Sequence, residues 1–138
     1  MMAGDPTHER GMEVRREVLG DEYVDDSMDR TTSFTADFQD LITRYAWGEI
    51  WTRPGLDRKT RSCITLTALM AQGQLEELAL HVGGALRNGL TEEEIKEVLL
   101  HGAVYCGMPA ARAAFAVAQS VLAERRGSQE EAAEDQSE

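Results

Sequence analysis

The sequence predicts an all-α protein, and three observations support this class. Alternating polar and apolar residues, the signature of a half-buried strand, are nearly absent from the 138 residues. Apolar residues instead recur three and four positions apart, as they do on one face of a helix. Glycine and proline interrupt this pattern at intervals, where helices typically end. A chain of this length favours one helical domain. It can bury a core but not a large cleft of its own, so a second subunit could be needed to complete a ligand site.

Residues 34–51 carry the first strongly apolar helical pattern, and Pro54 ends it. Asp57 is a plausible N-cap for the next helix. That helix runs to about Gln72, is apolar on most sides and is therefore expected to be buried. Gly73 is a suitable terminator. The apolar residues of the first pattern are Phe34, Phe38, Leu41, Ile42 and Tyr45.

A further helix is predicted over residues 74–88, and Thr91 with Glu94 forms a capping box that opens the next one. This next helix has apolar residues on two opposite sides, so we expect one side to contact another subunit. Pro109 suits the first turn of a last helix that runs to about Glu124.

The net charge of −11 lies mostly at the two ends of the chain. Residues 1–32 form an acidic arm with a possible polar helix at its start, followed by an irregular stretch. Residues 33–126 form the folded domain, and residues 127–138 an acidic tail that we expect to be disordered, because it has no apolar anchor. Phosphate binding needs a basic stripe, so the acidity argues against a nucleic-acid partner.

The sequence also predicts a cytoplasmic protein with no membrane association. We find no signal peptide, and no apolar run approaches the roughly 18 residues that a membrane span requires. The two cysteines, Cys63 and Cys106, are far apart in sequence, which suits a reducing compartment.

The leading candidates for chemistry are Glu77 and His81, which are four residues apart and therefore share a helix face. His81 lies at the edge of the apolar stripe, where it can be half sheltered and still meet a ligand. A nearby carboxylate raises a histidine pKa, so we expect an imidazolium that can act as a general acid. The alternative is an ordinary surface pair that contributes little.

A second candidate is the segment RYAWGEIWTRPG, residues 44–55. Trp47 and Trp51 could form the walls of a small pocket with Glu49 or Arg53 pointing inward. The alternative is that the tryptophans simply belong to the hydrophobic core, which is the commoner case for either one alone. Arg61 lies one turn inside the next helix. If that end of the helix is buried, the charged side chain needs an anion or carboxylate partner. The alternative is a helix start that is exposed to solvent.

Glu97, His101 and Tyr105 form another row at four-residue spacing. It could line a pocket, but such a row is more often a helix flank at a subunit contact. Glu77 and His81 with His101 fall short of a zinc signature, which usually needs three or four ligands, so no metal site is predicted. Phosphate-binding, nucleophile-elbow and CxxC motifs are also absent from the sequence.

Three blocks of the sequence form a long and specific combination: FTADFQDLI, RYAWGEIWTRPGLDRKTRSCITLTALMA and EELALHVGGALRNGLTEEEIKEVLLHGAVYCGMPAARAAF. With these blocks the chain resembles the carboxymuconolactone decarboxylase family, and within it the 4-carboxymuconolactone decarboxylases. The resemblance implies an alkylhydroperoxidase-D-like helical bundle that assembles as a homo-oligomer, commonly a hexamer. In the redox branch of that superfamily, two cysteines fall at the positions of Gln74 and Glu77, and a relay glutamate at Ser62. Both thiols are missing here, which counts against peroxidase activity.

The activity that the resemblance implies is decarboxylation of 4-carboxymuconolactone to the 3-oxoadipate enol-lactone, in the catabolism of protocatechuate. The substrate is a lactone dicarboxylate whose own ring and carbonyl take up the electrons left behind when carbon dioxide departs. No metal, thiamine or pyridoxal cofactor is therefore required. We assign proton or hydrogen-bond donation to His81, its orientation to Glu77, and carboxylate binding to Arg61 and Arg53.

Trp47 and Trp51 would then form apolar walls. The reversed assignment, with Glu49 as the acid and His81 as a carboxylate binder, stays open. So do two other functions, a thiol-dependent peroxidase of the same fold and a non-catalytic oligomeric module.

Overall fold

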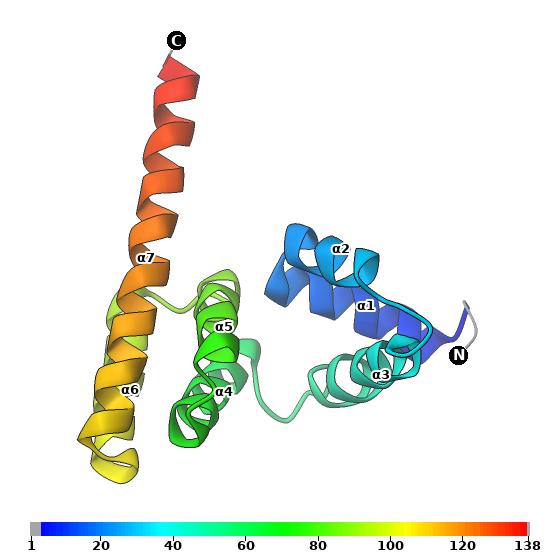
Figure 1. Ribbon diagram of the computed structural model, residues 1–138, viewed down its shortest axis with the longest axis horizontal. Coiled ribbons are helices and arrows are strands. Elements are labelled where there is room, and N and C mark those ends of the chain that lie inside the picture. The colour runs from blue at the N-terminus through cyan, green and yellow to red at the C-terminus, as the bar shows by residue number, and fades with distance from the viewer. Residues whose placement is uncertain (1–3, 138) are drawn as a thin grey trace. The chain divides into compact units, whose positions relative to one another are not determined.

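The computed structural model describes residues 4–137, and every regular element in that range is a helix, which confirms the all-α class (Figure 1). The chain divides into two compact units, residues 1–61 and residues 62–138. The elements in chain order are α1 (Pro6–Leu19), α2 (Asp21–Asp29), α3 (Ala36–Leu41), η1 (Ile42–Ile50), α4 (Arg58–Gln72), α5 (Leu75–Arg87), α6 (Glu92–Cys106) and α7 (Met108–Ser137).

In the first unit, α1 packs against η1 through two glycines. A Cβ on Gly11 would overlap the carbonyl oxygen of Thr43, and a Cβ on Gly48 would lie 2.5 Å from the carbonyl oxygen of Thr7. The two helix backbones therefore approach more closely than any larger residue allows.

The η1 segment is a π-helix that continues directly from α3. The sequence predicts this helix correctly in extent but as ordinary α-helix. Wider π turns are uncommon and occur frequently at functional sites. Here the π segment buries Trp47, which is 5% exposed, and ends immediately before Trp51.

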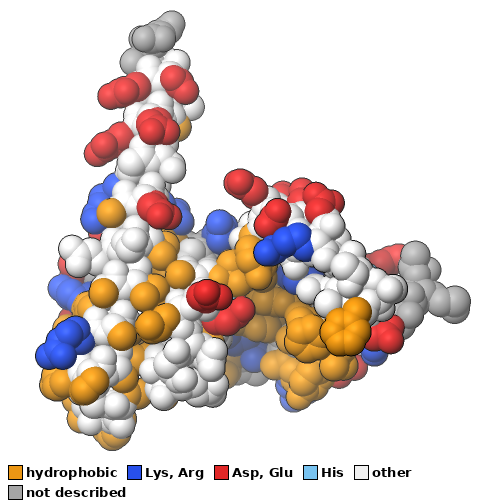
Figure 2. Space-filling view, viewed as in Figure 1, with side chains coloured by type: hydrophobic (Ala, Val, Ile, Leu, Met, Phe, Trp, Pro, Cys, Tyr) orange, Lys and Arg blue, Asp and Glu red, His pale blue; other side chains and the backbone are white. Residues whose placement is uncertain are grey.

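The apolar row that predicts this helix is largely exposed to solvent. Phe34 is 93% exposed, and Phe38, Leu41 and Tyr45 are also exposed. Figure 2 shows hydrophobic side chains gathered on the surface of this unit. The helix face that packs inward carries Thr43 and Trp47 instead.

A buried arginine connects the elements of the first unit. Arg15 of α1 is 3% exposed and donates to Thr43 Oγ1 (3.2 Å), Ser27 Oγ (3.3 Å) and Gln39 Oε1 (3.0 Å). These partners lie on η1, α2 and α3. The predicted irregular stretch after α1 is in fact largely the helix α2, and its buried Ser27 is one of the three contacts.

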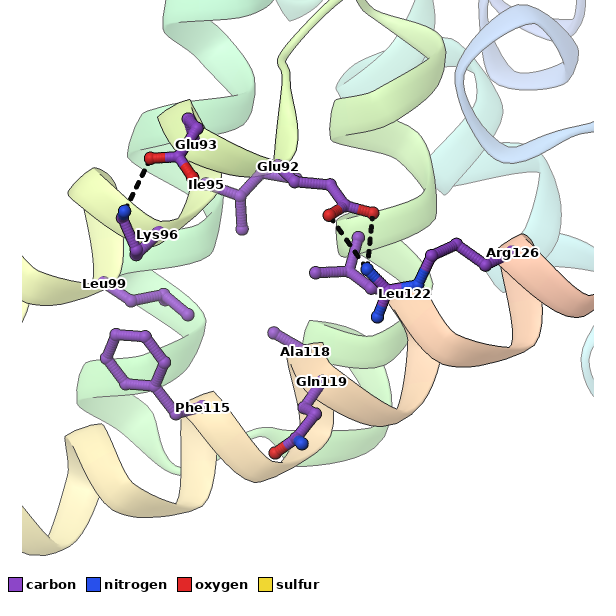
Figure 3. A pocket seen from close by; sticks show the side chains of 10 residues that line it. All are labelled: Glu92, Glu93, Ile95, Lys96, Leu99, Phe115, Ala118, Gln119, Leu122 and Arg126. Carbon is purple, nitrogen blue, oxygen red and sulfur yellow. Dashed lines mark hydrogen bonds and ion pairs between the residues drawn. The ribbon is translucent and has the colours of Figure 1, made fainter.

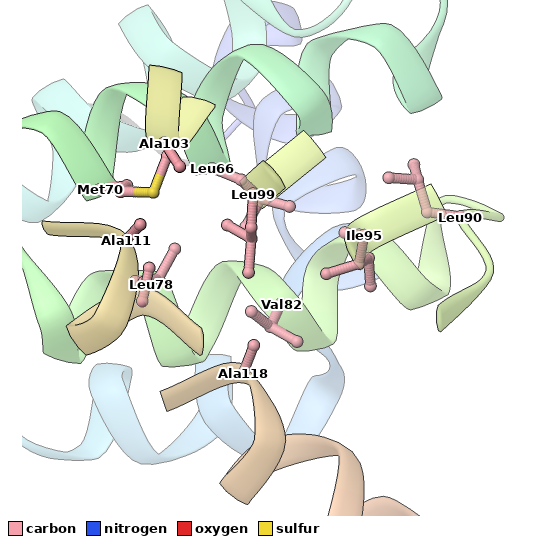
Figure 4. Packing of buried hydrophobic residues seen from close by; sticks show 12 residues of the cluster. Leu66, Met70, Leu78, Val82, Leu90, Ile95, Leu99, Ala103, Ala111 and Ala118 are labelled. Carbon is pink, nitrogen blue, oxygen red and sulfur yellow. The ribbon is translucent and has the colours of Figure 1, made fainter. Parts of the chain in front are cut away.

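The second unit encloses a continuous apolar core between α4, α5, α6 and α7 (Figure 4). Leu66, Leu78, Val82, Ile95 and Leu99 are each at most 1% exposed. A Cβ on Gly102 of α6 would overlap the end of the Met70 side chain, so α4 and α6 are close there. The expectation that α4 is buried on most sides is wrong, since Ile64 is 55% exposed.

The predicted helix signals are confirmed. Thr60 N–H donates to Asp57 Oδ1 at 2.7 Å, and Thr91 with Glu94 forms the reciprocal capping box at 3.0 Å each. Gly73 has a φ of 68°, which favours glycine at the sharp turn between α4 and α5.

The last helix extends beyond its predicted end near Glu124. Residues 127–137 continue α7 as helix, which corrects the expectation of a disordered tail over that range. Glutamate, glutamine and alanine favour helix even where side chains are exposed, as most are here. Over residues 4–137, no helix is long and apolar enough to cross a membrane.

Candidate active site

Glu77 and His81 lie on α5, one turn apart, as predicted. Glu77 Oε2 is 4.0 Å from His81 Nε2. The His81 side chain is 13% exposed, whereas that of Glu77 is 55% exposed. The imidazole is therefore sheltered at the edge of the core, and the carboxylate is largely in water.

Burial lowers the pKa of His81 from 6.5 to about 4. This corrects the expectation that Glu77 would hold the imidazole charged. The carboxylate is at the limit of ion-pair distance and its charge is solvated, so its attraction is weak. Desolvation of the imidazolium dominates, and His81 is neutral near pH 7.

A third polar side chain shares this face of α5. Asn88 follows His81 by seven residues, which is close to two full helical turns. Its Nδ2 donates to Ser62 Oγ on α4 at 2.9 Å, and Ser62 is only 2% exposed. Asn88 is not among the residues predicted from the sequence, because its bond to Ser62 joins residues 26 positions apart.

The tryptophans predicted to wall a pocket lie in the first unit and stack on each other. The ring centroids of Trp47 and Trp51 are 5.1 Å apart, with an interplanar angle of 27°. Trp47 is buried and Trp51 is half-buried. Glu49 is exposed.

Arg61 and Arg53 are brought together through the backbone. Arg61 Nη2 donates to the carbonyl oxygen of Arg53 at 2.9 Å. This bond holds the Arg61 side chain against the loop that follows η1. The exposed Arg53 side chain leaves its own guanidinium in solvent.

The row on α6 is exposed, as expected for a helix flank. The rings of His101 and Tyr105 are 5.5 Å apart and tilted by 46°, and Tyr105 is 79% exposed. Beside them, a shallow hollow of about 410 Å³ is lined by Cys63, Thr67, Glu97, Val98 and His101.

A separate cavity of about 290 Å³ lies between α6 and α7 (Figure 3). Leu99 and Phe115 are among its apolar walls, and Arg126 Nη1 reaches Glu92 across it at 3.1 and 3.3 Å. None of the predicted site residues lines this cavity.

The described residues hold no group of three His, Cys, Asp or Glu side chains that could bind a metal ion. Neither Cys63 nor Cys106 forms a disulfide.

Comparison with known proteins identifies the family. Residues 36–120 match the carboxymuconolactone decarboxylase family. The chain is 44% identical over 121 residues to the 4-carboxymuconolactone decarboxylase of Acinetobacter baylyi, covering 88% of this chain and 90% of that protein. It is 48% identical over 122 residues to the nitrosuccinic acid decarboxylase of Metarhizium robertsii, covering 86% and 85%. With both the family match and these relatives spanning most of its length, the chain belongs to the carboxymuconolactone decarboxylase family.

Proposed function

We propose that this protein is a carboxy-lyase that converts 4-carboxymuconolactone to the 3-oxoadipate enol-lactone without a cofactor. The observation that carries this proposal is the 44% identity to a 4-carboxymuconolactone decarboxylase along 90% of that protein. The reaction belongs to the catabolism of protocatechuate, an aromatic compound, and we place the protein in the cytoplasm.

The chemistry needs little from the protein, because the substrate is its own electron sink. The substrate is a five-membered unsaturated lactone with an acetate arm and a carboxylate on the ring carbon bonded to oxygen. When the bond to that carboxylate breaks, carbon dioxide leaves and the electron pair delocalises through the ring alkene onto the lactone carbonyl. A proton added to the carbon next to the carbonyl then gives the product.

His81 has the properties that the developing oxyanion requires. A neutral imidazole in a sheltered position donates an N–H hydrogen bond without the cost of burying a charge. An anionic ligand beside it raises its pKa, so the same ring can gain a proton once the substrate is bound. Glu77, one turn away, orients the ring.

The remaining roles are those that the resemblance to the family implies. Arg61 and Arg53 hold a substrate carboxylate, and Trp47 and Trp51 provide an apolar wall that favours loss of neutral carbon dioxide. In the reversed assignment, Glu49 donates the proton and His81 binds a carboxylate.

A second candidate substrate is nitrosuccinic acid, which the name of the 48% identical relative indicates. It too is a dicarboxylic acid with a built-in electron sink, since a nitro group accepts the electrons released with carbon dioxide. The same neutral donor at His81 would serve a nitronate as well as a dienolate. The two candidates therefore differ in substrate, and share one mechanism.

We further propose that the protein is a homo-oligomer, with a hexamer as the expected state, and that α6 contributes to a subunit contact. Val104 of α6 is 75% exposed, and Leu100, one turn before it, is also exposed, as is Met108 at the start of α7. Exposed apolar patches of this kind typically mark an interface. Val104→Glu should lower the sedimentation coefficient, because the oligomer would dissociate into a smaller species. An unchanged sedimentation coefficient would show that α6 is not part of the subunit contact.

The decisive experiment is an ultraviolet assay of lactone consumption by the purified protein, run in parallel with nitrosuccinate. A higher kcat/KM for the lactone supports the proposal, and a higher value for nitrosuccinate favours the second candidate. Turnover of neither acid, with no thermal shift from either, would favour a non-catalytic module. A peroxide assay with a dithiol donor tests the peroxidase alternative, which the missing thiols at Gln74 and Glu77 disfavour.

A further inference from the structure

We propose that the outward face of α6 binds the same face of a second copy of this chain, in an antiparallel two-fold contact centred on His101. This inference specifies the subunit contact proposed above for α6, and it rests on that proposal. It begins from the row Glu97, His101 and Tyr105, whose four-residue spacing puts the three side chains on one side of the helix. All three are exposed, Tyr105 at 79%, so the row is accessible to a partner.

The row is chemically complementary to itself. A two-fold contact brings the same surface of both copies together, so each residue must suit the one that lies opposite. When two antiparallel helices meet at His101, the residue four positions before it lies opposite the residue four positions after it in the other copy. Each Glu97 carboxylate, an acceptor, then faces a Tyr105 hydroxyl, a donor. A neutral imidazole has one donor and one acceptor nitrogen, so the two His101 rings can share a hydrogen bond at the axis.

The shape of this face fits the same arrangement. A hollow of about 410 Å³ lies beside the row and is lined by Cys63, Thr67, Glu97, Val98 and His101. Tyr105 projects next to this hollow in its own chain and is not part of its lining. In the antiparallel contact, the tyrosine of the second copy arrives at Glu97, on the wall of the hollow. The projecting ring of each copy therefore meets a recess in the other.

Tyr105 is held in a defined position before it binds. Its ring centroid is 5.5 Å from that of His101, with the two rings tilted by 46°. Contact with a neighbouring ring restricts the rotation of an exposed side chain, so less conformational entropy is lost on association. Tyrosine is also enriched at the centres of protein interfaces, where it often contributes most to binding.

Apolar side chains beside the row add hydrophobic burial to the contact. Val104 is 75% exposed and Leu100 is 48% exposed. The antiparallel arrangement places Val104 of each copy opposite Val98 of the other, which is half-buried at the hollow. The two Glu97 carboxylates lie on either side of the axis, about 12 Å apart along it, so their mutual repulsion is weak.

The test is an exchange of charge between the two positions that the contact pairs, measured by sedimentation. Tyr105→Glu places a carboxylate opposite the partner's Glu97, so the dissociation constant of the oligomer should rise by about tenfold or more. The double variant Glu97→Arg, Tyr105→Glu places an arginine opposite each new carboxylate and should restore association. The two positions are eight residues apart on one helix and do not face each other within a chain. A restored oligomer therefore reports a contact between copies.

Two further variants control for fold and for general charge effects. Glu124→Arg changes an exposed acid on α7, outside the proposed contact, and should leave the sedimentation coefficient unchanged. Tyr105→Phe keeps the ring and removes the hydroxyl, so it should weaken association less than Tyr105→Glu does. Far-ultraviolet circular dichroism checks that every variant keeps its helix content.

The outcomes separate this inference from the proposed activity. An unchanged oligomer in Tyr105→Glu overturns the inference and leaves the proposed oligomer standing. A double variant that stays dissociated also overturns it, because positions 97 and 105 then do not face each other. A monomeric unmodified protein overturns this inference together with the proposed oligomer. Lactone turnover is assayed separately, and an oligomer that shows the charge exchange without turnover would overturn the decarboxylase assignment alone.

Discussion

His81 Nε2 lies 4.0 Å from Glu77 Oε2, yet the imidazole is neutral at physiological pH. Proximity to a carboxylate is not sufficient to charge a histidine when the histidine is buried and the carboxylate is in water. The balance between these two effects determines how the candidate site can work, and it can be tested without the substrate.

The first prediction concerns stability and pH. The pKa of His81 is about 4 in the folded state and near 6.5 in the unfolded chain, so below pH 6.5 the unfolded state binds a proton that the folded state does not. Stability should therefore fall as the pH drops from 6.5 towards 4, by on the order of 3 kcal/mol in total. Above pH 6.5 this contribution should be constant.

Urea unfolding of the unmodified protein and of His81→Gln, at several pH values, measures this effect. The glutamine variant cannot titrate, so its stability should decline less over the same interval. Parallel curves for the two proteins would show that His81 does not carry the dependence.

The second prediction compares the two members of the pair in catalysis. His81→Ala should lower kcat by about a hundredfold or more, as expected for loss of a proton or hydrogen-bond donor. Glu77→Gln should lower it by much less, because burial and not Glu77 sets the pKa of the imidazole.

His8→Asn, on α1, is the matched control and should leave kcat unchanged. A change in KM alone for His81→Ala would assign it to binding and favour Glu49 as the acid. An equal loss in Glu77→Gln and His81→Ala would mean that the carboxylate takes part directly.

The third prediction concerns the contact between α1 and η1. Gly11→Ala places a methyl group onto the Thr43 carbonyl oxygen, which is backbone and cannot rotate away. The helices must separate, and we expect a loss of about 1–3 kcal/mol in the free energy of unfolding. Gly55→Ala is the matched control, since a Cβ there meets nothing within 4 Å. Equal stability of the two variants would contradict the close approach.

The fourth prediction concerns Arg15, whose three side-chain partners are all uncharged. Burial lowers the pKa of this guanidinium, which reflects the cost of holding its charge out of water. Arg15→Met fills similar space without a charge, so it should be clearly more stable than Arg15→Ala, which leaves a cavity. Equal melting temperatures for the two variants would show that packing at this position contributes little.

Local features were predictable from the sequence, and features that depend on packing were not. The Asp57 cap and the capping box of Thr91 and Glu94 are set by neighbouring residues, and both are confirmed. The row from Phe34 to Tyr45 has correct helical spacing, but spacing does not say which neighbour covers it, and it is exposed.

The candidate site shows the same division. The four-residue spacing correctly placed Glu77 and His81 on one face, because helical geometry is local. The charge of His81 was wrongly predicted, because it depends on how deeply the other helices bury it. Asn88 was missed, because its bond to Ser62 joins residues 26 positions apart. The roles of Arg61, Arg53, Trp47, Trp51 and Glu49 stay predictions.

The contacts of Arg15 have a consequence for motion in the first unit. The Arg15 guanidinium connects α1 to side chains on α2, α3 and η1. None of these helices can therefore detach without breaking a hydrogen bond to Arg15. Amide hydrogens across residues 6–50 should then exchange with solvent in one shared opening event, with similar protection throughout and no gradual fraying from helix to helix.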